Sequence, residues 1–153
     1  MIGTILAASA VLMTSTTAQA QNAPAPPSSA LQGGPATDVP VLATAQVSPD
    51  CGGLYELAGR AFCVTANLGQ IGALADAYIA DLGGKGWLPA GGDDNRVVFA
   101  KRREGGGCDG LQMIAFYDTT KTAVAELPAY LGFATSPGDV CAAPAPASGS
   151  VAQ

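Results

Sequence analysis

The sequence predicts an α+β fold: a small disulfide-stabilised domain with an antiparallel sheet and one main amphipathic helix. Three observations predict it. Apolar residues recur at helical spacing across about 68–82, two β-type segments form a hairpin across about 96–117, and the short chain holds four cysteines. With 153 residues the chain is limited to one small domain. Its 20 glycines and 11 prolines prevent long uninterrupted elements from dominating.

The helix across about 68–82 carries one apolar stripe with the i, i+3, i+4, i+7 spacing of a helix that packs on a core. The members of this stripe are Ile71, Leu74, Ala75, Tyr78, Ile79 and Leu82. Asn67 is placed to cap its start, with Gln70 in the reciprocal capping-box position. Glycines from Gly83 to Gly86 provide its left-handed end.

The hairpin consists of Arg96–Arg103 and Leu111–Tyr117, joined by a glycine-rich loop at 104–110. We expect Arg103 to pair with Gly110. This register places Val97, Phe99, Ile114 and Phe116 on one face, which should meet the helix, together with Lys101 and Gln112 toward its end. The other face then shows an apolar patch of Val98, Ala100, Met113 and Ala115, bordered by Arg96, Arg102 and Tyr117.

That apolar patch needs a cover, because a solvated strand face normally carries polar residues. Either the chain covers it, with Leu54–Ala58 or Thr119–Leu127, or another molecule does. Under the second interpretation, the patch is a binding surface with a flexible methionine at its centre and Arg and Tyr at its rim. Its candidate residues are Arg96, Val98, Ala100, Arg102, Met113 and Tyr117.

The remaining elements follow from shorter patterns. Ala61–Thr65 and Tyr130–Thr135 are predicted strands, Thr119–Leu127 a short helix stopped by proline, and residues 90–95 a turn-rich segment. The Asp93-Asp94 pair is interpreted as a solvated turn rather than as catalytic carboxylates or a calcium loop. The resulting order is strand, helix, two strands, short helix, strand.

The N-terminus has the pattern of a signal peptide. The apolar run Ile2–Met13 is followed by polar residues and then by Ala18-Gln19-Ala20, which predicts a signal peptide at 1–20 and cleavage before Gln21. Residues 21–49 are predicted to be a Pro/Ala-rich disordered linker and 142–153 a disordered tail. The single globular domain is expected at 50–141, in the periplasm or secreted, with no membrane span in the mature chain.

The four cysteines predict two disulfides, because an exported small domain meets an oxidising environment. We expect the pairs Cys51–Cys63 and Cys108–Cys141, since neighbours in sequence meet most easily. The alternative is a zinc site of four thiolates. Its usual Cys-x2-Cys spacing is absent from the sequence, so no metal is expected.

Composition restricts the function. A net charge of −5 and a pI near 4.3 argue against nucleic acid as a partner. The sequence has no histidine, which excludes Ser-His-Asp and Cys-His catalysis and His-ligated metals, and no cofactor is predicted. The hypothesis is a non-enzymatic exported domain that binds an unknown protein or envelope component. The alternative is a small hydrolase-like envelope enzyme using carboxylates and Lys or Arg, which would need a pocket containing such a group with a strongly shifted pKa.

Overall fold

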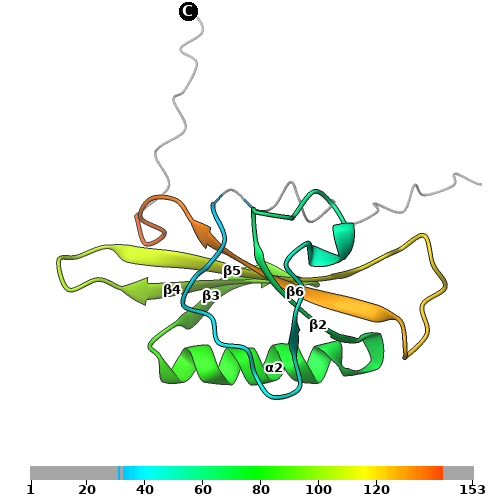
Figure 1. Cartoon of the computed structure of the whole chain (residues 1–153). Helices are drawn as coiled ribbons and strands as arrows, with labels where there is room; N and C mark the ends of the chain where they lie inside the picture. Colours follow the sequence, from blue (N-terminus) through cyan, green and yellow to red (C-terminus); the bar gives the residue numbers. More distant parts are fainter. Residues whose placement is uncertain (1–30, 32, 143–153) are drawn as a thin grey trace, which may run out of the picture.

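A computed structural model describes residue 31 and residues 33–142, which form one six-stranded antiparallel sheet with a helix on one face (Figure 1). The strand order is β1-β2-β6-β5-β4-β3. Along the chain the elements are β1 (Gln46–Val47), η1 (Cys51–Gly53), β2 (Phe62–Asn67), α2 (Leu68–Gly84), β3 (Leu88–Asp93), β4 (Arg96–Arg102), β5 (Cys108–Tyr117) and β6 (Pro128–Ser136). The predicted α+β class with an antiparallel sheet and one main helix is confirmed.

The helix α2 buries Leu74, Tyr78 and Leu82, members of the predicted stripe, against the sheet. Its end is a Schellman turn, in which Gly86 has a φ of 85°. The Trp87 N–H donates to the Leu82 carbonyl and the Gly86 N–H to the Gly83 carbonyl, each at 3.0 Å. The predicted glycine-rich helix end is therefore confirmed.

The start of α2 differs from the prediction, because the Asn67 side chain makes no capping hydrogen bond. The first helical N–H groups instead donate to the loop before β6: Leu68 to the Leu127 carbonyl at 2.7 Å and Gly69 to the Ala125 carbonyl at 2.9 Å. Residues 119–127 form this loop, so the short helix predicted there is wrong. The loop conformation gains these two backbone hydrogen bonds, which outweigh the weak local preference for a helix.

The chain before β1 belongs to the packed domain. Leu31, Ala36, Val39 and Ala45 are buried, and the Tyr78 hydroxyl donates to the Pro40 carbonyl at 2.9 Å. The Leu42 N–H donates to that same hydroxyl at 3.3 Å, and burial raises the pKa of Tyr78. The predicted linker therefore cannot extend to residue 49. Predictions for residues 1–30 and 143–153, including the signal peptide, lie outside the described residues.

The hairpin β4–β5 forms, but in a register three residues from the predicted one. Val97 pairs with Met113 and Phe99 with Leu111, where the prediction paired Val97 with Phe116. The cause is the loop: Cys108 already pairs with Arg102, so only 103–107 turn the chain. An odd shift reverses the faces of β5. Val97 and Phe99 face α2 as expected, but Leu111 and Met113 join them in place of Ile114 and Phe116.

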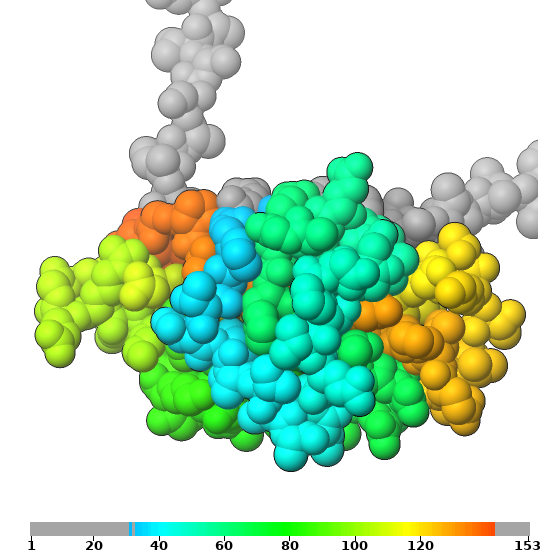
Figure 2. Space-filling view, in the orientation of Figure 1, coloured from blue at the N-terminus to red at the C-terminus, as the bar shows by residue number. Residues whose placement is uncertain are grey.

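The other face of the sheet has its own core, to which residues 51–61 contribute. This core is not the predicted patch with its cover, because Met113 and Ala115 pack on the helix side instead. Its buried members are Leu31, Cys51, Leu57, Ala61, Cys63, Ile114, Phe116 and Ala134. In Figure 1 and Figure 2 the segment before β2, coloured blue through cyan to green, runs across the front of the molecule. The segment at 90–95, predicted to be turn-rich, instead lies mostly in the edge strand β3 (Leu88–Asp93), which has a bulge between Pro89 and Gly91.

Candidate functional site

The structure brings together four of the six residues of the predicted binding surface. Arg96, Val98, Ala100 and Arg102 alternate along β4 on the face away from α2. Met113 lies on the opposite face, 3% exposed in the helix-side core, because the register reverses β5. The predicted apolar patch therefore does not exist in that form.

Tyr117, the sixth residue, lies at the far end of β5, where its carbonyl accepts a hydrogen bond from the Tyr55 hydroxyl. On the β4 face, Arg96 Nε and Gln112 Oε1 are buried without a hydrogen-bond partner within the described chain. A water or another polar group is needed to satisfy them. Arg96 also bonds to Asp93 at 2.8 Å across the β3–β4 turn. Asp94 lies in this turn as predicted, whereas Asp93 is the last residue of β3.

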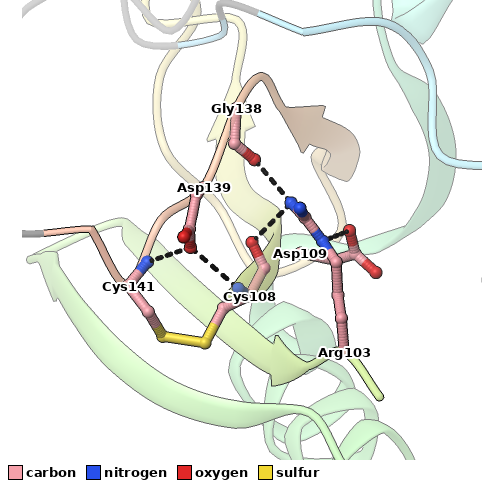
Figure 3. The surroundings of a disulfide bond; sticks show 6 residues. All are labelled: Arg103, Cys108, Asp109, Gly138, Asp139 and Cys141. Carbon is pink, nitrogen blue, oxygen red and sulfur yellow. Dashed lines mark hydrogen bonds and ion pairs between the residues drawn. A yellow bond between two sulfur atoms is a disulfide. The ribbon is translucent and has the colours of Figure 1, made fainter. Parts of the chain in front are cut away.

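Both predicted disulfides, Cys51–Cys63 and Cys108–Cys141, are present, and each has a Cα–Cα distance of 5.3 Å. Figure 3 shows how the second is held. The Asp139 Oδ1 atom accepts the N–H groups of Cys108 at 2.7 Å and Cys141 at 2.9 Å. The Arg103 guanidinium donates to the carbonyls of Cys108 and Gly138, both at 2.8 Å. Asp139 and Arg103 therefore fix the last turn of the domain onto β5.

The two sulfurs of this disulfide and the Asp139 carboxylate lie within 4.8 Å of one another, a grouping that resembles a metal site. In the oxidised protein both sulfurs are bonded to each other and are not thiolates, the form that binds metals. The Asp139 carboxylate is also already engaged by two amides. This cluster is therefore structural in the disulfide form.

The Asp139 contacts predict an acid-dependent stability. The Cys108 and Cys141 amides lower the pKa of Asp139 in the folded protein, so its stabilisation is complete above the unfolded value of about 3.9 and is lost as pH falls through the lower folded value. We expect Asp139→Asn to melt below wild type at neutral pH and to approach it at about pH 2. Thermal melts across this range measure the difference. A constant difference at every pH would contradict the assignment.

A concave feature lies at the other end of the sheet, where β1 meets the segment before η1 and the junction of β2 and α2. It is a cleft of about 680 Å³, within the range of roughly 300–1,000 Å³ typical of ligand sites. We call it the β1 cleft. The residues that line it are Thr44, Gln46, Val47, Ser48, Pro49, Asp50, Gly52, Thr65, Ala66, Asn67, Gln70, Pro128 and Tyr130.

One wall of the β1 cleft is a tight loop held by its own side chains. The Ser48 hydroxyl donates to Asp50 Oδ1 at 3.1 Å, and the Gly52 N–H lies within hydrogen-bonding distance of both side chains. The backbone is left-handed at Cys51 and Gly52, with φ of 54° and 69°. Cys51 is fully buried, and its disulfide to Cys63 ties the loop covalently to β2. This bond restrains the loop in the left-handed conformation. The wall is therefore preformed.

Tyr130 also lines the β1 cleft. Its ring stacks on Phe116 with centroids 5.4 Å apart, and a Cβ at Gly52 would lie 2.4 Å from its ring. Position 52 therefore requires glycine to let the loop approach the ring. Tyr130 is half-buried, and it is held from behind by the second core.

A smaller cavity of about 310 Å³ adjoins the cleft and shares Thr44, Ala66 and Gln70 with it. The other residues that line it are Ala73, Leu74 and Ala77 of α2, so this part is apolar. The two cavities together form a polar cleft with an apolar extension.

Sequence reasoning missed this site. Asn67 and Gln70 were singled out only as capping residues, and their positions in the cleft follow from the meeting of β1, β2 and α2. The sequence offered one signal, which is that these two amides lie beside the predicted start of the helix. In the structure, the carbonyls of residues 125 and 127 cap that helix start instead.

Comparison of the chain with protein-family models, with curated proteins and with solved structures gives no match. Among the described residues, no helix is long and apolar enough to cross a membrane.

Proposed function

We propose that this protein is an exported, non-catalytic binding domain and that the β1 cleft is its ligand site. The observation that carries the proposal is the preformed cleft of about 680 Å³, one wall of which is fixed by a buried disulfide. Rigid walls favour binding because less conformational entropy is lost when the ligand enters. The two disulfides and the apolar Ile2–Met13 run support export.

The chemistry of the lining supports binding rather than catalysis. Among the described residues that line the cleft, Asp50 is the one carboxylate, and its Oδ1 atom already accepts hydrogen bonds from Ser48 and Gly52. Acid–base hydrolysis by carboxylates uses a second group of suitable pKa nearby. The carboxyl groups with shifted pKa, Asp118 and Asp139, lie outside the cleft, and hydrogen bonds lower both values. Their contacts to Thr120 and to the cysteine amides are structural.

The test compares two tryptophan substitutions at exposed threonines. Thr44→Trp fills the cleft, whereas Thr122→Trp adds the same side chain to the 119–127 loop. Each oxidised protein is immobilised and exposed to the low-molecular-mass fraction of periplasmic extract, and the retained compounds are identified by mass spectrometry. We expect wild type and Thr122→Trp to retain a compound that Thr44→Trp does not, at equal melting temperatures.

Identical retention by all three proteins would contradict a ligand site in the cleft. The export half of the proposal is tested separately, by N-terminal sequencing of the protein from expressing cells. Processing between Ala20 and Gln21 is expected, and an intact Met1 on the recovered protein would contradict it.

A further inference from the structure

We infer that the ligand of the β1 cleft is a neutral, polyhydroxylated molecule with a small apolar substituent, such as an acylated sugar unit of a glycan. This inference rests on the proposed function and names the ligand class of the same site. It follows from the polar groups, the charge and the shape of the lining, taken in turn.

The polar groups of the lining mostly both donate and accept hydrogen bonds. Amides come from Gln46, Asn67 and Gln70, and hydroxyls come from Thr44, Ser48, Thr65 and Tyr130. The Ser48 and Thr65 hydroxyls already donate to Asp50 and to the Ala129 carbonyl, so toward a ligand they act as acceptors. Sugar hydroxyl groups have the same dual character, so each can be satisfied by such a lining. A typical drug-like pocket is instead predominantly apolar with a few polar groups. The ligand that fits here is therefore polar over most of its surface.

The charge of the lining argues against an anionic ligand. None of the described residues that line the cleft is Lys or Arg, whereas Asp50 contributes a carboxylate. The protein as a whole carries a net charge of −5. Recognition of phosphate or carboxylate groups relies on cationic donors, above all arginine. A neutral ligand whose hydroxyls donate to Asp50 agrees with this arrangement.

The apolar extension accounts for the substituent. The cavity of about 310 Å³ is lined on α2 by Ala73, Leu74 and Ala77, and Gln70 lines both spaces. An acyl group such as an acetamido methyl can enter this extension while the ring hydroxyls stay in the polar part. Removing apolar ligand surface from water then adds affinity.

An extended peptide is the competing ligand, because β1 is a short edge strand beside the cleft. Peptides that add to a sheet edge need several consecutive unpaired backbone groups. Here β1 is only two residues long and pairs with β2 along its inner edge, so its outer edge offers the backbone groups of Gln46 and Val47 alone. Just beyond β2, the Leu68 and Gly69 N–H groups are bonded to residues 127 and 125. The remaining edge is too short for strand addition, which favours the sugar.

The experiment is an NMR titration of the full-length, oxidised, ¹⁵N-labelled protein with three separate probes at millimolar concentration. Chitotetraose carries acetamido groups, cellotetraose is the same kind of chain without them, and tetra-alanine is a neutral peptide. We expect saturable shifts at Gln46, Asn67 and Gln70 with chitotetraose, a several-fold weaker Kd for cellotetraose, and no saturable shifts with tetra-alanine.

Two variants of exposed helix residues test the side-chain contact. Gln70→Ala removes an amide that lines both cavities, and we expect a loss of about tenfold or more in chitotetraose affinity, equivalent to about 1.4 kcal/mol. Asp76→Ala is the matched control on the same helix, away from the cleft lining. We expect it to bind as wild type does, and both variants to keep the wild-type melting temperature.

Absence of saturable shifts with either saccharide would overturn the inference, as would binding of tetra-alanine at the cleft in their place. Equal affinity for cellotetraose and chitotetraose would overturn the assignment of the apolar extension. An unchanged affinity of Gln70→Ala would show that the saccharide binds elsewhere. The retention difference between Thr44→Trp and Thr122→Trp tests the cleft independently, so the proposed function can stand when the ligand class fails.

Discussion

The Met113→Glu variant is expected to lose about 3–5 kcal/mol of the free energy of unfolding. Met113 is 3% exposed, and it lies beneath α2 in the core that also contains Phe99, Phe133 and Tyr78. A glutamate there must either carry a buried charge or stay protonated without a hydrogen-bond partner placed to receive it. The packing contacts of the methionine are lost as well. Urea unfolding at neutral pH measures the loss.

The matched substitution is Val98→Glu on the next strand. Val98 is half-buried and, within the described part of the chain, belongs to neither core cluster. We therefore expect Val98→Glu to cost only about 1 kcal/mol, near the average for single substitutions. The predicted register placed Val98 and Met113 on one face, whereas the structure places them on opposite faces. Equal losses for the two variants would contradict the structure.

Replacing both Cys51 and Cys63 by alanine is expected to produce the second large loss. The chain-entropy relation gives about 3 kcal/mol for a loop of this length, and the sequence separation is 12. Both sulfurs are buried in the second core, at 0% and 1% exposure, so their packing is lost in addition. We expect a total of about 3–5 kcal/mol, measured by urea unfolding under non-reducing conditions.

The control for this variant is the double alanine substitution at Cys108 and Cys141. It also removes a loop constraint, with a separation of 33, but Cys141 is exposed and the disulfide holds only the last turn of the domain. We expect the saccharide-induced shifts at the β1 cleft to survive in this control and to weaken when Cys51 and Cys63 are replaced. Loss of cleft binding in both variants alike would contradict the role of Cys51–Cys63 in shaping the wall.

Local patterns in the sequence were sufficient to predict the elements that depend mainly on residues close together in the chain. The apolar spacing from Ile71 to Leu82 predicted α2, and the glycines after it predicted its end. The four cysteines predicted both disulfides, since in each pair the partners are neighbours in sequence. The alternating β-type segments predicted the β4–β5 hairpin.

Only the tertiary structure decided the register, the helix cap and the candidate site. Strand periodicity leaves the pairing of β4 with β5 open, and both faces of β5 are apolar, so the pattern of Leu111–Tyr117 could not select one. Likewise, the carbonyls that cap α2 come from residues 125 and 127, far along the chain from Asn67. The β1 cleft depends on the meeting of Ser48–Gly52, Gln70 and Tyr130. Such contacts are fixed by the packing of distant segments, which no local pattern in the sequence encodes.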